Sequence, residues 1–113
     1  VDGSDGRVVT ALTLAPRHLQ HTGVVHAGVI GAMADHTMGA AAQTMALEGH
    51  WVLTAEYKTS LLRAARGQRL ECVGVVIKPG RQVSFTEAEV FAIDGDRRTL
   101  VAKASATMAV VKA

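Results

Sequence analysis

The sequence predicts an α+β fold in which one long helix packs against an antiparallel β-sheet. A single Ala-, Gly- and Met-rich stretch has helical length, and several strand-like runs follow it with only turn residues between them. Strands that follow one another without intervening helices pair as antiparallel neighbours. The predicted order is β-α-β-β-β-β, and we expect one domain over residues 1–113.

The first elements are a strand and a loop. Residues 7–15 read as a strand that stops at Pro16, because proline cannot donate to a β-ladder. Residues 18–25 then form a predicted loop that turns at Gly23. This loop leads directly into the helix.

The predicted helix covers residues 26–47, with Gly49 as its C-cap. Its apolar residues lie almost all the way round, so the helix must be covered on most sides. A single small sheet cannot cover it completely. We therefore expect a second subunit to contribute to its burial.

Four strands are predicted after the helix, over residues 51–61, 69–78, 82–93 and the final run from Leu100. The first alternates Thr54, Glu56, Lys58 and Ser60 against Ala55, Tyr57, Thr59 and Leu61. The turns are Pro79-Gly80 and Asp94-Gly95-Asp96. The last strand has an apolar face that lets a helix lie close, made of Ala102, Ala104, Ala106, Met108 and Val110.

Composition excludes several classes of protein. At 49% hydrophobic and 19% charged residues the chain is globular, and no apolar run reaches the ~18 residues of a membrane span. Its arginines are scattered and it has only four aromatic residues, so we expect no nucleic-acid partner. Cys72 is alone, which fits a reducing cytoplasm, and it reads as a small buried residue. No histidine or cysteine spacing predicts a metal site.

Asp35 is the first candidate for chemistry. It lies among apolar helix residues, where a carboxylate loses hydration unless it is paired. It is either a nucleophile or general base, or else a solvent-facing or hydrogen-bonded structural residue. His26, at the predicted helix start, donates to a substrate oxygen or caps the helix.

The backbone at the helix start is a second candidate. The amides of Ala27 and Gly28 lack helical acceptors and can stabilise an oxyanion. Ala27 and Asp35 are eight residues apart, about 12 Å along one helix. One substrate carbonyl cannot meet both. If both act, they come from two subunits of a symmetric dimer.

The ordered motifs resemble the hotdog-fold thioesterases, specifically the phenylacetic-acid-pathway (PaaI-like) acyl-CoA thioesterases. The family pattern is an amide residue, a glycine turn, His-Gly-Gly and an acid nine residues after the His. Here these are Gln20, Gly23, His26-Ala27-Gly28 and Asp35. The likeness continues through TAEYKTSLLRAARG (54–67), GRQVSFTEAEVF (80–91) and the strand from Leu100, and so covers nearly the whole chain.

The resemblance implies roles for these positions. Asp35 corresponds to the catalytic carboxylate, and Ala27 offers its amide to the thioester oxygen with help from Gln20 and His26. Thr54 matches a hydroxyl that holds the attacking water in relatives. Two positions depart from the family pattern, because Ala27 replaces its first Gly and Ala64 a Pro. Members with a leader helix also exist, and since this chain begins directly at a strand we expect a trimmed or partly ordered form.

The implied substrate is an acyl-CoA with a small aromatic or medium-chain acyl group. Small, apolar helix residues are candidates for lining the acyl pocket. They are Gly28, Gly31, Ala34, Met38 and Gly39. Arg63 and Arg81, which follows Gly80, are candidates for the CoA phosphates. No cofactor is expected, since CoA is part of the substrate. A homodimer is required and a homotetramer is expected.

Two other functions fit the same resemblance. One is a hotdog dehydratase or hydratase, which pairs a His with an acid across the dimer. The other is a non-catalytic acyl-CoA binding module that uses the same pocket. The Gln20 to Asp35 spacing favours hydrolysis.

Overall fold

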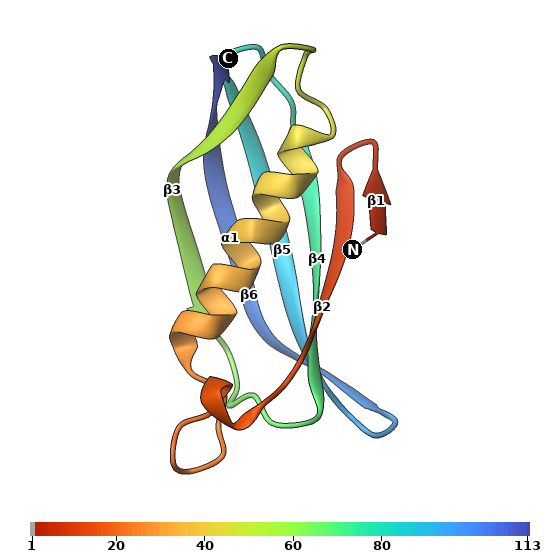
Figure 1. Cartoon of the computed structure of the whole chain (residues 1–113), viewed down its shortest axis with the longest axis vertical. Coiled ribbons are helices and arrows are strands. Elements are labelled where there is room, and N and C mark those ends of the chain that lie inside the picture. Colours follow the sequence, from red (N-terminus) through yellow and green to blue (C-terminus); the bar gives the residue numbers. More distant parts are fainter. Residues whose placement is uncertain (1) are drawn as a thin grey trace.

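The computed structural model describes residues 2–113, in which one helix lies against a six-stranded antiparallel sheet (Figure 1). The helix α1 is Ala27–Gln43, preceded by a short 3-10 turn, Pro16–His18. The strand order is β1-β2-β4-β5-β6-β3. The strands are β1 (Asp2–Ser4), β2 (Arg7–Thr13), β3 (His50–Leu61), β4 (Arg69–Lys78), β5 (Val83–Asp94) and β6 (Arg97–Lys112).

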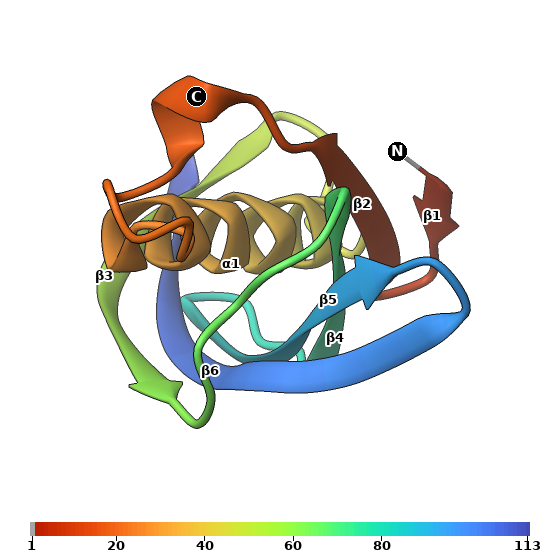
Figure 2. The ribbon, with the colours of Figure 1, turned by 90° about the horizontal axis from the view of Figure 1, so that it is seen from below.

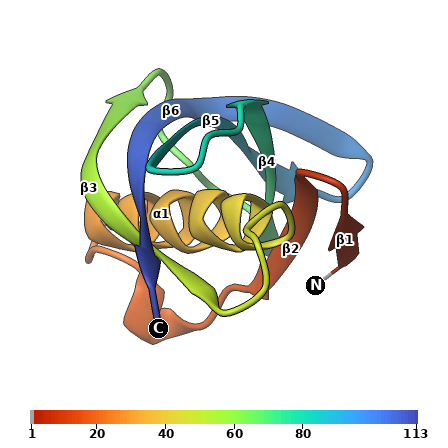
Figure 3. The ribbon, with the colours of Figure 1, turned by 90° about the horizontal axis from the view of Figure 1, so that it is seen from above.

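The sheet curls around the helix, with β2 on one side of α1 and β3 on the other (Figures 2 and 3). We call the side that faces α1 the inner face and the opposite side the outer face. This is the predicted α+β arrangement, a hotdog fold. The core is the contact between the inner face and one side of α1.

Small residues on the inner face let the helix approach closely. A Cβ added at Gly74 would lie 3.0 Å from the backbone oxygen of Thr37. The predicted small apolar face of β6 is also confirmed, since Ala102, Ala104, Ala106 and Met108 are all buried. The backbone of α1 and the backbone of the sheet therefore lie close together, because only small side chains separate them.

The helix is shorter than the predicted 26–47, because it ends at Gln43. Thr44 Oγ1 donates to the oxygen of Ala41 at 2.7 Å and accepts from the amide of Gly6 at 2.7 Å. This hydroxyl ties the helix end to the β1–β2 turn. Gly49, with φ +78°, belongs to the turn that enters β3 and does not cap the helix.

The N-terminal hairpin was not predicted. Asp2–Ser4 pair with β2 through a turn at Asp5 and Gly6, both of which have positive φ. Three residues are too few for an alternating pattern to be read from sequence.

The predicted alternation of β3 is wrong at Thr54. Thr54 pairs with Met108 and Glu56 with Thr107, so Ala55 is an extra residue that forms a β-bulge. The bulge shifts the alternation by one. Thr54 therefore shares the inner face with Tyr57, Thr59 and Leu61, opposite to Glu56.

The sheet does not enclose the helix completely. Gly28, Ala32 and His36 lie on an exposed side of α1. No helix within residues 2–113 is long and apolar enough to cross a membrane, and no cluster of metal-binding side chains occurs in this range.

We predict that Cys72 is inert at neutral pH. Its side chain is fully buried, as the sequence predicts, and burial raises the pKa of the thiol to about 11 although a hydrogen bond with Thr37 lowers it. Ellman's reagent should label it only after unfolding. Because the folded-state pKa is raised, its contribution to stability should be present below about pH 9 and fall as the pH approaches 11. Fast labelling of the folded protein at pH 7 would contradict this burial.

Candidate active site

The loop before α1 is a tight turn. The amide of Gln20 donates to Val24 O at 2.8 Å, and that of Gly23 donates to Gln20 O at 2.9 Å. Gly23 has φ +83°, a conformation that a residue with a Cβ adopts only with strain. The turn predicted at Gly23 is confirmed.

Contacts from distant segments fix this loop. The amide of Val25 donates to Ala65 O at 3.0 Å, and Arg66 Nη1 donates to Thr22 O at 3.1 Å. The amide of His26 donates to His18 O at 2.9 Å. The sequence does not predict this support from residues 65 and 66, although both lie in the motif TAEYKTSLLRAARG (54–67).

The start of α1 presents unsatisfied amides. His26 is the N-cap, and its side chain makes no capping hydrogen bond. Its backbone oxygen accepts from the amide of Val29 at 3.0 Å. The amides of Ala27 and Gly28 have no acceptor within residues 2–113, so they form an exposed donor pair at the positive end of the helix.

Asp35 and Thr54 meet where α1 faces β3. Thr54 Oγ1 donates to Asp35 Oδ1 at 2.7 Å, and it also lies 3.5 Å from Met108 Sδ. Asp35 is half-buried. The hydroxyl holds one carboxylate oxygen against the sheet and leaves the other available to a second partner.

The seam between α1 and β3 continues from Asp35 toward the helix start. A Cβ at Gly31, one turn before Asp35, would lie 3.7 Å from the Tyr57 hydroxyl and 4.0 Å from Thr59 Oγ1. Thr59 Oγ1 is buried and has no hydrogen-bond partner in the described chain. Three hydroxyl groups, from Thr54, Tyr57 and Thr59, therefore line one seam. Neither Tyr57 nor Thr59 was predicted as a site residue.

Other predicted site residues are distributed differently. Met38 and Ala34 are completely buried in the core, which leaves them no surface for a substrate to contact in the single chain. Gly28 and Gly39 have open space around them, since a Cβ at either would meet no atom within 4 Å. Gln20 and His26 are exposed at the helix start.

The arginine candidates lie at opposite ends of the sheet. Arg63 lines a cavity of about 230 Å³ near the helix start, between the β3–β4 loop and the base of the β5–β6 hairpin. Arg66 and Arg97 line the same cavity, and neither was predicted. Gly80 and Arg81 are in the β4–β5 turn and line a different hollow with Met45 and Leu47.

Comparisons with known proteins identify the family of the chain and similar folds. The family model described as the thioesterase superfamily matches residues 22–99. No curated protein sequence matches the chain. A solved thioesterase family protein from Silicibacter pomeroyi is 28% identical with a TM-score of 0.97, over 100% of this chain and 83% of that chain.

Two further structures are similar. A conserved protein from Pseudomonas aeruginosa is 32% identical with a TM-score of 0.87, over 98% of this chain and 86% of that chain. A Streptococcus mutans protein bound to acetyl CoA has 22% identity and a TM-score of 0.86, over 99% and 86% of the two chains. At that identity the last similarity supports the fold alone.

Proposed function

This chain belongs to the thioesterase superfamily and is a thioester hydrolase, and we propose that it hydrolyses an acyl-CoA with a small aromatic or medium-chain acyl group. The observation that carries the proposal is the Asp35–Thr54 pair on the seam between α1 and β3. A half-buried carboxylate oriented by a hydroxyl is suited to attack a carbonyl carbon or to activate water. The likeness to the PaaI-like group supports the acyl-CoA class.

The proposed reaction needs a nucleophile and an oxyanion donor. A thiolate leaves readily because a thiol pKa is near 8.5, so a strong general acid is unnecessary. Water supplies the oxygen that bonds to the acyl carbon, the carbon–sulfur bond breaks, and the CoA sulfur takes the proton. In one route Asp35 attacks first and water then hydrolyses the anhydride; in the other Asp35 removes a proton from water. Neither route needs a cofactor.

The oxyanion donor comes from the partner subunit in this proposal. The amide of Ala27 is about 12 Å along the helix from Asp35, too far for one carbonyl group to meet both. A two-fold related copy with an antiparallel helix brings its own Ala27 amide toward Asp35. Gln20 and His26, beside that amide, help to orient the thioester.

The free edge of β3 supports this dimer. β3 has 12 residues and is the last strand of the sheet, so only its edge toward β6 is paired within residues 2–113. A long unpaired edge is a template for pairing with another chain. Tyr57, Leu61 and Leu62 are also exposed beside it, at 48%, 53% and 47%. Antiparallel pairing of two β3 edges would cover these side chains.

The acyl group is proposed to lie along the seam near Gly31 and the open helix face at Gly28 and Gly39. These glycines keep space that a side chain would fill. The Tyr57 ring forms one wall of this space. A small aromatic ring or a medium alkyl chain suits a narrow seam of this kind.

The CoA phosphates are proposed to bind at the cavity of Arg63, Arg66 and Arg97. Nη1 of Arg63 donates to Leu100 O at 2.8 Å, and Arg66 is held by Thr22, so both guanidinium groups are positioned before a ligand arrives. Positioned arginines suit phosphate recognition. The S. mutans protein that shares this fold is bound to acetyl CoA, so a chain of this fold is able to hold a CoA thioester.

The function is tested with a panel of aryl- and alkyl-acyl-CoAs, measuring CoA release by thiol detection. Asp35→Asn should lower kcat by about 100-fold or more, because the carboxylate acts in the transition state. Thr54→Val should lower it less, and Thr54→Ser should keep most of the activity. Acyl-CoA binding without release would instead indicate a binding module. Loss of substrate with no free CoA would indicate a hydratase or dehydratase.

The composite site is tested with Ala27→Pro. Proline is tolerated at the first position of a helix and removes one amide donor, so kcat should fall by about 100- to 1,000-fold in a folded protein. Mixing this variant with Asp35→Asn should restore about a quarter of the wild-type activity, because half of the dimers are mixed and each has one intact site. Absence of recovery after subunit exchange would place both groups in one subunit.

The phosphate site is tested with Arg97→Ala. Arg97 is chosen because Arg63 and Arg66 also donate hydrogen bonds to backbone oxygens, so replacing either of them would remove a structural contact as well. KM for an acyl-CoA should rise up to about 5-fold, the effect of one exposed charge pair. KM for an acyl-pantetheine, which lacks the nucleotide phosphates, should not change. An effect in Arg81→Ala but not in Arg97→Ala would move this subsite to the β4–β5 turn.

A further inference from the structure

Arg66 lies between two parts of the proposed site that contact opposite ends of an acyl-CoA. Its side chain lines the cavity of about 230 Å³ near the helix start, together with Arg63 and Arg97, and we call this the arginine cavity. Nη1 of Arg66 also donates to the backbone oxygen of Thr22 at 3.1 Å. One exposed guanidinium group therefore contacts both the arginine cavity and the loop before α1.

The hydrogen bond from Arg66 supports a small turn, residues 20–24, from outside. Inside the turn the amide of Gln20 donates to Val24 O at 2.8 Å, and that of Gly23 donates to Gln20 O at 2.9 Å. Among residues 2–113, Arg66 is the one residue outside the turn that hydrogen-bonds to it. A Cβ at Gly23 would lie 3.5 Å from Arg66 Nη1, so the guanidinium group also lies against the tip of the turn. Arg66 therefore helps to fix the turn, and Gln20 with it, relative to the helix start.

The same guanidinium group has donors left for an anion. It carries five N–H donors in a planar fork, and the bond to Thr22 uses one of them. The bond is exposed to water and the side chain is long, so without a second partner the guanidinium group exchanges between this position and others. A phosphate in the arginine cavity would accept from the remaining donors and hold the guanidinium group in place. The contact with Thr22 would then be made more of the time.

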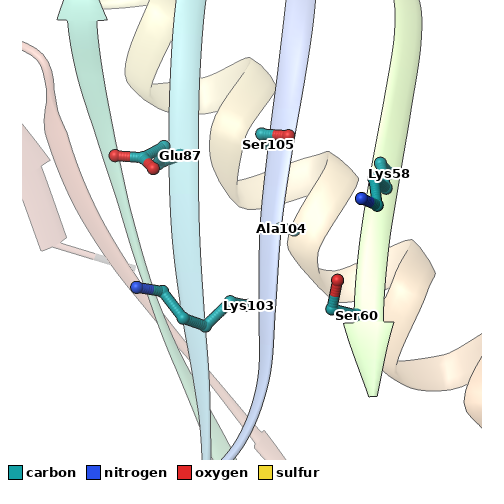
Figure 4. Close-up of a pocket in the computed structure, with 6 residues that line it drawn as sticks. All are labelled: Lys58, Ser60, Glu87, Lys103, Ala104 and Ser105. Atoms are coloured by element: carbon teal, nitrogen blue, oxygen red, sulfur yellow. The ribbon is translucent and has the colours of Figure 1, made fainter. Parts of the chain in front are cut away.

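The arginine cavity suits an anion better than the hollow on the outer face of the sheet. Three arginines line the cavity, and the Asp94 carboxylate beside them already accepts a hydrogen bond from Gln68 Nε2 at 2.9 Å. The hollow on the outer face, of about 130 Å³, mixes Lys58 and Lys103 with Glu87 (Figure 4). It also lies on the side of the sheet away from α1, so an anion there would not meet the loop before the helix (Figure 4).

We propose that Arg66 is a positioning residue that couples the nucleotide end of an acyl-CoA to the helix start. A CoA phosphate in the arginine cavity fixes Arg66 against Thr22, which holds the turn 20–24 and places Gln20 beside the Ala27 amide. The phosphates then raise the rate of the chemical step as well as the affinity. Binding energy from a remote part of a substrate acts in this way when it orders the groups at the reacting centre. This inference rests on the proposed acyl-CoA hydrolysis and on the phosphate site proposed with it.

The proposal also assigns the phosphates to one subunit of the proposed dimer. Arg66 and the turn that it holds are in the same chain as the Ala27 amide, and that amide serves Asp35 of the partner subunit. The CoA nucleotide therefore binds to the subunit that supplies the oxyanion donor, while the other subunit supplies the carboxylate.

The first test compares an acyl-CoA with the acyl-pantetheine that carries the same acyl group, in a single turnover with enzyme in excess. The wild-type rate constant should be about 10-fold higher for the acyl-CoA, the effect of one hydrogen bond to a charged group. Arg66→Met should make the two rate constants equal, and because Arg66 is exposed the variant should fold. Lys103→Met removes the same charge from the outer face and should keep the difference.

The outcomes of this test separate the coupling from the proposed function. Equal rate constants in the wild type, or a difference that survives in Arg66→Met, would overturn the coupling. Hydrolysis itself is observed in both of these cases, so the proposed function stands. Release of thiol from neither substrate would instead contradict the proposed function.

The second test supplies the nucleotide separately. Adenosine 3′,5′-bisphosphate, a fragment of CoA, should accelerate the hydrolysis of an acyl-pantetheine by the wild type, while sodium chloride at the same ionic strength should not. Arg66→Lys keeps the charge but loses the planar fork, so it should bind the nucleotide within about 5-fold of the wild-type affinity and show no acceleration. A damaged fold would not separate affinity from rate in this way. No acceleration in the wild type, or acceleration in Arg66→Met, would overturn the proposal.

Mixed dimers test the assignment to a subunit. An equal mixture of Arg66→Met and Asp35→Asn, after subunit exchange, should recover about a quarter of the wild-type rate on an acyl-CoA, because half of the dimers are mixed and each has one intact site. If Arg66 served Asp35 of its own chain, no mixed dimer would have an intact site and recovery would stay below about a tenth. Such low recovery would overturn the assignment.

Discussion

The close contact between α1 and the inner face of the sheet is the constraint on which the rest of the structure depends. At Gly74 a methyl group would already press on the helix backbone, and the alanines of β6 keep the same closeness across the sheet. Such tight packing fixes the distance of the helix from the sheet and its rotation about its own axis. Asp35 consequently meets β3 at one defined point, and the helix start meets the loop held by residues 65 and 66.

Much of this could be predicted from the sequence. The single long helix, the four strands after it and the small face of β6 each follow from a periodic pattern, because burial on one side imposes that pattern. The glycine turn before the helix also follows from the sequence and is confirmed. The roles of Asp35, Gln20, His26 and Ala27 in catalysis remain predictions.

What the sequence could not predict depends on contacts between distant segments. The helix ends at Gln43, next to Thr44, whose hydroxyl accepts from the amide of Gly6 in the β1–β2 turn, and no local pattern contains that partner. Thr54 was assigned to the wrong face because a bulge has no periodicity of its own. Arg97 joins Arg63 and Arg66 only after the β5–β6 hairpin meets the β3–β4 loop.

The bulge at Ala55 has a consequence for how this fold can vary. Because it reverses the alternation, the two halves of β3 present side chains to the inner and outer faces in opposite phase. Removing that one residue would turn the Thr54 side chain away from Asp35. Every side chain of β3 before the bulge, including those of Trp51 and Leu53, would move to the opposite face of the sheet. An insertion or deletion elsewhere in a surface loop changes only the loop. In β3, a change of one residue in length would alter the carboxylate's partner and the surface offered to other molecules in a single step.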